Sequence, residues 1–147
     1  MIYKIVFAFV VVFALVSCKS PSPIQQYQDY KGAKLIVGSG GGFTGQYIDY
    51  IILKNGAVYK KDSFKDELVY LGKIKKNHAL QLFESFENAG LKDVKCNFPG
   101  NMNNYIKFVD NNDEYFLQWS MGQNGFVDPK VKLFYQIAMK KIGELTE

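Results

Sequence analysis

The N-terminal stretch Met1–Cys18 constrains the fold most. Lys4 precedes an unbroken apolar run at residues 5–16, and the small Ser17 follows it. A positively charged start, an apolar segment and a small residue are the parts of a secretory signal peptide. The twelve apolar residues would rise about 18 Å as a helix, which is short of the ~30 Å hydrocarbon core of a bilayer. The stretch is therefore predicted to be a leader, residues 1–17, and not a permanent membrane span.

The end of this leader reads Leu15-Val16-Ser17-Cys18, where an ordinary cleavage site has small residues of the A-x-A kind. These four residues resemble the bacterial lipobox, the cleavage signal of lipoproteins. In that family the cysteine thiol receives a diacylglyceryl group, the peptide is cut just before it, and the new amine is usually acylated, for example with palmitate. The resemblance implies that Cys18 is lipidated and begins the mature chain. Two or three acyl chains would hold the protein stably on a membrane.

Residues 18–32 follow as a polar segment with Pro21, Pro23 and no apolar period. This composition predicts a flexible spacer between membrane and domain. It also disfavours the alternative that the leader is a buried helix of the domain. No acidic run follows Cys18. In Bacteroidota lipoproteins such a run is associated with export to the cell surface, so the resemblance implies an outer-membrane anchor that faces the periplasm.

Length and charge limit the class of protein. Removing residues 1–17 from the 147 leaves 130, enough for one domain with one core, expected at 33–147. The net charge of +4 falls to +3 without Lys4, and the basic residues are spread among acidic ones. No nucleic-acid partner is therefore expected. If Cys18 carries lipid, Cys96 has no partner within the chain, and the domain must fold without a disulfide.

Hydrophobic periodicity predicts an α+β fold, with an antiparallel sheet of five to six strands and two helices packed on one face. Asn55-Gly56 lies between two runs of aromatic and β-branched residues, which predicts a hairpin. A helix is expected over residues 77–89, capped by Asn77 and ended by Gly90, and Asp128-Pro129 should open another. The predicted strands are 33–37, 46–53, 57–60, 68–74, 105–109 and 114–119.

The most conspicuous motif after the leader is the glycine-rich segment 38–45, GSGGGFTG. Gly40, Gly42 and Gly45 match G-x-G-x-x-G, but a dinucleotide site needs a helix to begin there, and residues 46–53 are predicted to be a strand. A kinase phosphate loop is excluded because the chain has no H-R-D and no D-F-G. Two hypotheses remain. The glycines permit positive φ or close backbone packing, or they form an exposed loop whose amides bind an anion or a partner.

A second turn-rich stretch, residues 97–104, is the other candidate for binding. Phe98 and Met102 would make a recognition patch if they are exposed, whereas Trp119 is expected in the core. The candidate binding residues from the two stretches are Gly40, Gly41, Gly42, Phe43, Thr44, Phe98 and Asn101.

The residues that catalysis would use are few. His78 and Cys96 are the only pair that suggests thiol chemistry, and no third residue is evident to orient the imidazole. One histidine and one cysteine cannot supply the three or four ligands that zinc needs. We therefore expect no metal site and no cofactor, and we assign no catalytic residue.

The lipobox, GSGGGFTG and the later FPGN turn together resemble a group of small lipoproteins from Bacteroidota. That resemblance covers most of the chain, implies an envelope location, and brings no catalytic residue. The favoured hypothesis is a non-enzymatic, membrane-anchored envelope protein that binds another protein, a peptide or an envelope polymer. The alternatives are a small envelope hydrolase or thiol enzyme using Cys96 with His78, and a purely structural or assembly lipoprotein.

Overall fold

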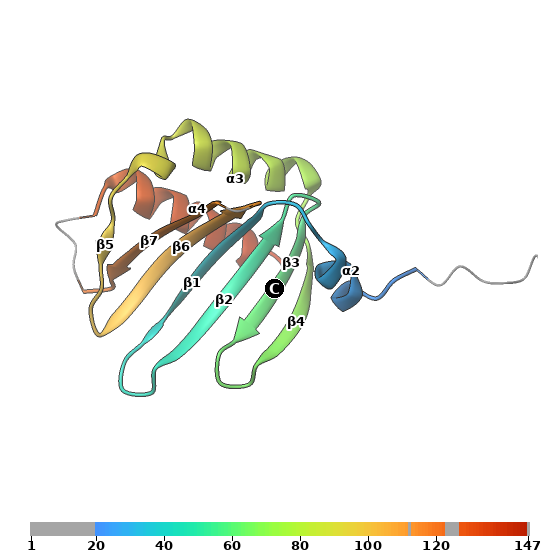
Figure 1. Ribbon diagram of the computed structural model, residues 1–147, viewed down its shortest axis with the longest axis horizontal. Helices are drawn as coiled ribbons and strands as arrows, with labels where there is room; N and C mark the ends of the chain where they lie inside the picture. Colours follow the sequence, from blue (N-terminus) through green and yellow to red (C-terminus); the bar gives the residue numbers. More distant parts are fainter. Residues whose placement is uncertain (1–19, 112, 123–126, 147) are drawn as a thin grey trace, which may run out of the picture.

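The computed structural model describes residues 20–111, 113–122 and 127–146. The leader and Cys18, with its predicted lipid, lie outside these residues. Within them, strands and helices form an α+β arrangement (Figure 1). In chain order the elements are α2 (Pro23–Asp29), β1 (Lys34–Gly41), β2 (Gln46–Leu53), β3 (Ala57–Asp62), β4 (Glu67–Lys73), α3 (Lys76–Asn88), the 3₁₀ turn η1 (Leu91–Asp93), β5 (Asn97–Phe98), β6 (Met102–Asp110), β7 (Asp113–Ser120) and α4 (Pro129–Gly143).

The seven strands of the described chain belong to one sheet, in the order β4-β3-β2-β1-β6-β7-β5. β1 lies in the middle and pairs antiparallel with β2 and with β6. The edge strand β5 pairs parallel with β7, so the sheet is mixed. The α+β class is confirmed, but the prediction of five to six antiparallel strands is wrong in its detail. It omits β5 because two residues are too few to show a hydrophobic period.

Helices α3 and α4 cover one face of the sheet and bury the main core against it (Figure 1). Phe86 of α3 stacks on Phe108 of β6, with the ring centroids 4.7 Å apart. It also meets Phe134 of α4 edge-on at 5.5 Å. Trp119 is buried in the same core, as its sequence context predicts. Aromatic contacts of this kind hold the two helices on the sheet.

The ends of the helices follow the sequence with one exception. α4 begins after Asp128, whose carboxylate accepts a backbone N–H of the first turn, and Gly90 follows α3 in the left-handed conformation, as predicted. The predicted cap Asn77 is wrong, because α3 begins at Lys76 with Lys75 as the N-cap residue. The Asn77 side chain instead accepts the amide of the next residue. No side chain caps the start of α3.

A short helix, α2, forms where the sequence predicts a flexible spacer. Ser22 caps it by accepting the N–H of Gln25, and Pro23 occupies the first turn, where a missing N–H costs nothing. Seven residues are too few to form a stable helix alone. The helix therefore depends on its packing against the sheet, and the spacer prediction is wrong for residues 23–29.

The packing surface for α2 is the face of the sheet opposite α3 and α4. Ile24, Tyr27 and Tyr30 lie at a spacing of three residues and contact a small core. The hydroxyl of Tyr59 in β3 donates to the carbonyl of Pro23 at 2.8 Å, and Tyr30 accepts the amide N–H of Lys54 at 3.3 Å. These contacts hold both ends of α2 on the sheet. The small core consists of Ile51, Leu53, Ala57 and Tyr59.

The first half of the glycine-rich segment lies inside β1, in the centre of the sheet. Gly38 pairs with Asp49 on one side and with Tyr105 on the other. A Cβ at position 38 would come within 2.3 Å of the Tyr105 hydroxyl oxygen, so the ring crosses β1 in the space that glycine leaves. The hydroxyl then donates to the Asp49 carboxylate. Gly38 is therefore explained by close packing.

Replacing Gly38 with alanine should destabilise the fold by about 1–3 kcal/mol, because the added methyl group displaces Tyr105 from its place across β1. Urea-induced unfolding followed by circular dichroism measures the change. Gly143→Ala is the matched control, since a Cβ at this last residue of α4 meets nothing within 4 Å and alanine favours the helix. Equal stability of the Gly38→Ala variant and the unaltered protein would contradict this account of the central strand.

Candidate functional site

The two stretches that the sequence singles out for binding meet at one end of the sheet. Gly41 at the end of β1 pairs with Met102 at the start of β6. Just beyond this pair, the amide of Gly42 donates to the carbonyl of Asn101 at 2.5 Å. The register of the two central strands therefore brings the β1–β2 turn and the loop before β6 into direct contact.

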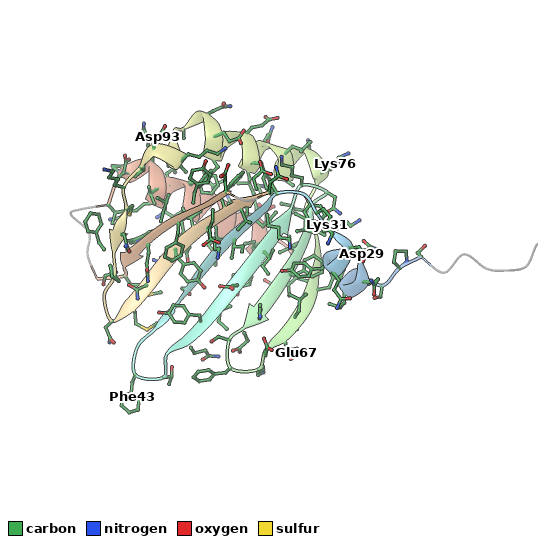
Figure 2. The ribbon with its side chains drawn as sticks, in the orientation of Figure 1. Asp29, Lys31, Phe43, Glu67, Lys76 and Asp93 are labelled. Atoms are coloured by element: carbon green, nitrogen blue, oxygen red, sulfur yellow. The ribbon has the colours of Figure 1, made fainter. Side chains whose placement is uncertain are left out.

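The β1–β2 turn presents one aromatic side chain. Gly42 and Gly45 both have positive φ, and the amide of Gly45 donates to the carbonyl of Gly42 at 3.2 Å. Phe43 projects from the tip of this turn and is fully exposed, with a relative accessibility of 106% (Figure 2). The Gly42 and Gly45 amides are occupied within the protein. Anion binding by these two amides is therefore not supported, and the exposed group of the turn is a phenyl ring.

Hydrogen bonds from the buried side chain of Asn103 hold the loop before β6. Its side-chain oxygen accepts the amide of Gly100 at 2.6 Å, and its side-chain nitrogen donates to the Gly100 carbonyl at 3.0 Å. Asn101, the predicted binding residue, contacts the β1–β2 turn through its backbone carbonyl. The polar residue that holds the loop is thus Asn103, which the sequence does not distinguish from its neighbouring asparagines.

The β3–β4 turn lies at the same end of the sheet. Ser63 binds β2 twice, since its amide donates to the Tyr47 carbonyl at 3.0 Å and its hydroxyl accepts the Tyr47 amide at 2.9 Å. Phe64, next in the chain, is 61% exposed. The sequence offers one signal for Phe64, since it is an aromatic residue inside a run of charged ones.

The carboxylates of Asp62 and Asp66 at the β3–β4 turn both have partners within the protein. The Asp62 carboxylate accepts from the Gln46 side-chain amide and from the Phe64 amide, and these hydrogen bonds lower the pKa of Asp62. Lys61 pairs with Asp66 at 3.0 Å. A pocket beside this turn has a volume of about 230 Å³, which is below the usual range for small-molecule sites. The β3–β4 turn therefore offers an exposed surface, and its pocket is too small for a typical small-molecule site.

Several loops at this end of the sheet expose apolar side chains. In addition to Phe43 and Phe64, the segments around β5, β6 and β7 each contribute one. Met121, which follows β7, is tied to this end because its amide donates to the Met102 carbonyl at 2.8 Å. Contiguous apolar patches on folded domains mark interaction sites, whereas single exposed apolar side chains are common. We call this set the apolar rim, and it consists of Phe43, Phe64, Phe98, Met102 and Met121.

His78 and Cys96 are not brought together. His78 lies in the first turn of α3, whereas Cys96 lies beyond the other end of that helix, which is about 20 Å long at 1.5 Å per residue. The Cys96 thiol is 3% exposed and donates to the Gln118 carbonyl at 3.6 Å. Burial raises the pKa of this thiol. The thiol and imidazole pair that catalysis would need is absent from the described part of the chain.

The described residues also contain no group of three or more His, Cys, Asp or Glu side chains that could hold a metal ion. None of the helices in residues 20–146 that the structure describes is long and apolar enough to cross a membrane. No protein-family model matches this chain, and no curated protein is significantly similar to it.

Replacing Asn103 with alanine should loosen the loop before β6. The substitution removes both hydrogen bonds to Gly100, which is expected to cost about 1–2 kcal/mol. Amide hydrogen exchange at Gly42, whose N–H is bonded to Asn101, should become faster. Asn101→Ala is the matched control, because it keeps the backbone carbonyl and should leave this exchange rate unchanged. Equal exchange in the two variants would show that Asn103 does not organise the loop.

Cys96 should resist alkylation in the folded protein. Burial restricts the access of iodoacetamide to this thiol, and the raised pKa reduces the fraction of thiolate, which is the form that reacts. We expect no carbamidomethyl group on Cys96 by mass spectrometry under native conditions, and complete labelling in urea. Rapid labelling of the folded protein would indicate a reactive thiol and reopen the enzyme hypothesis.

Proposed function

We propose that this protein is a lipid-anchored, non-catalytic module of the bacterial cell envelope that binds an apolar surface of another envelope protein through the apolar rim. The single observation that carries this proposal is the full exposure of Phe43, next to a second loop that exposes Phe98 and Met102. Full burial of a phenylalanine side chain is worth about 1.5–3 kcal/mol. Phe43 gains none of this within its own chain.

The rim is held in place before any partner binds. The Gly42 amide bonds to Asn101, which joins two loops, whereas Ser63 bonds to Tyr47 in β2 and Met121 bonds to Met102 in β6. A preorganised surface loses less conformational entropy on binding than a flexible one. This favours a binding role for the rim over the alternative of a purely structural lipoprotein.

The proposed location comes from the leader. An apolar run that ends at Ser17-Cys18 favours lipidation of Cys18, with the mature domain in the aqueous envelope and facing the periplasm. The absence of a paired thiol and imidazole in the described chain supports a binding role over thiol catalysis. No cofactor is part of the proposal.

Photo-crosslinking in the native host tests the rim directly. A benzoylphenylalanine residue at position 43 should crosslink to a specific envelope protein. The same residue at position 133 is the control, because Leu133 is 58% exposed on α4, away from the rim. Identical products from the two positions, or none from position 43, would contradict the proposal.

Phe43→Ser provides a second test of the same surface. We expect a change in unfolding free energy within about 0.5 kcal/mol, because the side chain is fully exposed. If Phe43 is an aromatic hot spot, its loss should weaken the free energy of partner binding by about 2 kcal/mol. The yield of crosslinked partner from benzoylphenylalanine at position 98 should then fall. Unchanged crosslinking from position 98 would remove Phe43 from the binding surface.

A further inference from the structure

A basic surface lies at the end of the sheet opposite the apolar rim. It forms where the segment before β1, the β2–β3 turn, the end of β4 and the start of α3 meet. Lys31 and Lys76 mark this end in Figure 2, away from Phe43. We call this surface the basic corner, and its five exposed lysines are Lys31, Lys54, Lys73, Lys75 and Lys76.

Backbone contacts hold these segments together. The amide of Lys54 donates to the Tyr30 hydroxyl, which places the β2–β3 turn beside the end of α2. The amide of Ile74 donates to the Gly56 carbonyl at 3.0 Å, which ties the segment before α3 to the same turn. The lysines thus come from distant positions in the sequence and are neighbours in the folded chain.

The Lys54 ammonium lies over the ring of Phe83, 5.5 Å from its centroid, so this lysine also contributes to the fold. The stability of the fold does not explain the charges at the start of α3. Lys75 and Lys76 stand at the start of α3, where the helix dipole disfavours positive charge, and no acidic residue occupies the first turn. Glu144 faces the corner across a pocket that Lys73, Lys75 and His78 also line. The pKa of Glu144 is lowered mainly by its hydrogen bond to Lys141, so its charge is shared with a lysine outside the corner.

The chemistry of the charges suits a diffuse anionic surface. The chain has 18 lysines and one histidine, and arginine is absent. Lysine acts as a flexible point charge, whereas arginine recognises single phosphates by paired hydrogen bonds. Clustered lysines next to a membrane anchor are attracted by anionic lipids within about a Debye length, ~8 Å at physiological ionic strength.

The tether is long enough to place the corner on the membrane. Five residue steps separate Cys18 from Pro23, and a fully extended chain spans at most about 3.6 Å per step, or ~18 Å. From Pro23, α2 runs toward the basic corner and ends beside Tyr30, which binds Lys54. Seven helical residues rise only about 10 Å. An anchor at Cys18 can therefore lie level with the corner while α2 stays docked.

We propose that the basic corner docks on the anionic lipid headgroups of the membrane that carries the anchor. This inference depends on the lipidation of Cys18 in the proposed function. Docking at this end turns the apolar rim away from the bilayer and toward the periplasm. The corner therefore orients the domain, and the rim stays accessible to its partner.

The test measures which end of the sheet approaches the lipid. The lipidated protein, extracted from host membranes, is reconstituted into phosphatidylcholine vesicles with or without phosphatidylglycerol. A fluorophore is attached at Asn55→Cys in the basic corner or at Thr44→Cys in the rim, and a nitroxide on the lipid headgroup quenches it. We expect quenching at position 55 in the anionic vesicles, with little at position 44 and little in neutral vesicles.

Substitution and salt then test the lysines. The Lys75→Gln/Lys76→Gln pair should weaken docking by roughly tenfold or more. The matched control, Lys95→Gln/Lys130→Gln, removes two exposed lysines elsewhere and should have little effect. Added sodium chloride should release the corner of the unaltered protein, which needs no variant to fold. Inorganic phosphate at equal ionic strength should act no more strongly than chloride.

Three results would overturn the proposal. The first is quenching at position 44 that equals or exceeds the quenching at position 55. The second is equal quenching in neutral and anionic vesicles. The third is release by phosphate well beyond release by chloride, which would indicate a discrete phosphate site. Protein that does not float with the vesicles at all would instead show that the anchor is missing. That outcome would remove the proposed envelope function together with this inference.

Discussion

The packing around strand β1 governs the rest of the structure. β1 pairs with β2 and β6 along its full length, and its residue Gly38 leaves the space in which Tyr105 crosses the strand to reach Asp49. Burial and the bond to Asp49 raise the pKa of Tyr105 strongly. Both candidate loops extend from the same end of these central strands. The β1–β2 turn and the loop before β6 are in contact because the register of β1 and β6 pairs Gly41 with Met102.

The two ends of the sheet differ in chemistry. One end exposes phenylalanine and methionine side chains on hydrogen-bonded loops, and the other exposes lysines from four segments. Helix α2 connects the sheet to the segment that carries the proposed anchor. It follows Cys18 by a few residues and is bound to the sheet through Tyr59 and Tyr30. A short connection of this kind restricts how the domain can stand on a membrane. With the proposed lipid on Cys18, the docked α2 would favour one orientation of the domain on the membrane.

Much of the fold could be predicted from the sequence because its signals are local. Asn55-Gly56, the apolar period of α3 and the Asp128-Pro129 start of α4 each act within a few residues. Helix α2 has a local start signal of the same kind, Ser22-Pro23, but it is short, and the role of its three apolar residues depends on the sheet face that they cover. The close approach of Tyr105 to Gly38 likewise joins residues that are far apart in the chain.

The candidate site could be predicted only in part. Phe43 and Phe98 are identifiable as aromatic residues among turn formers, and the structure brings their loops together. Asn103 and Phe64 could not be ranked above their neighbours, because burial and the course of the β3–β4 turn decide their roles. The basic corner could not be predicted from the sequence, because its lysines are spread along the chain and become neighbours only in the folded sheet.

The central claim is that a lipid on Cys18 holds this domain in the envelope, and mass spectrometry of the protein from its native host tests it most directly. The account predicts a chain that lacks residues 1–17 and begins at Cys18, with a diacylglyceryl group on the thiol. A chain that still begins at Met1 and carries an unmodified Cys18 thiol would contradict it.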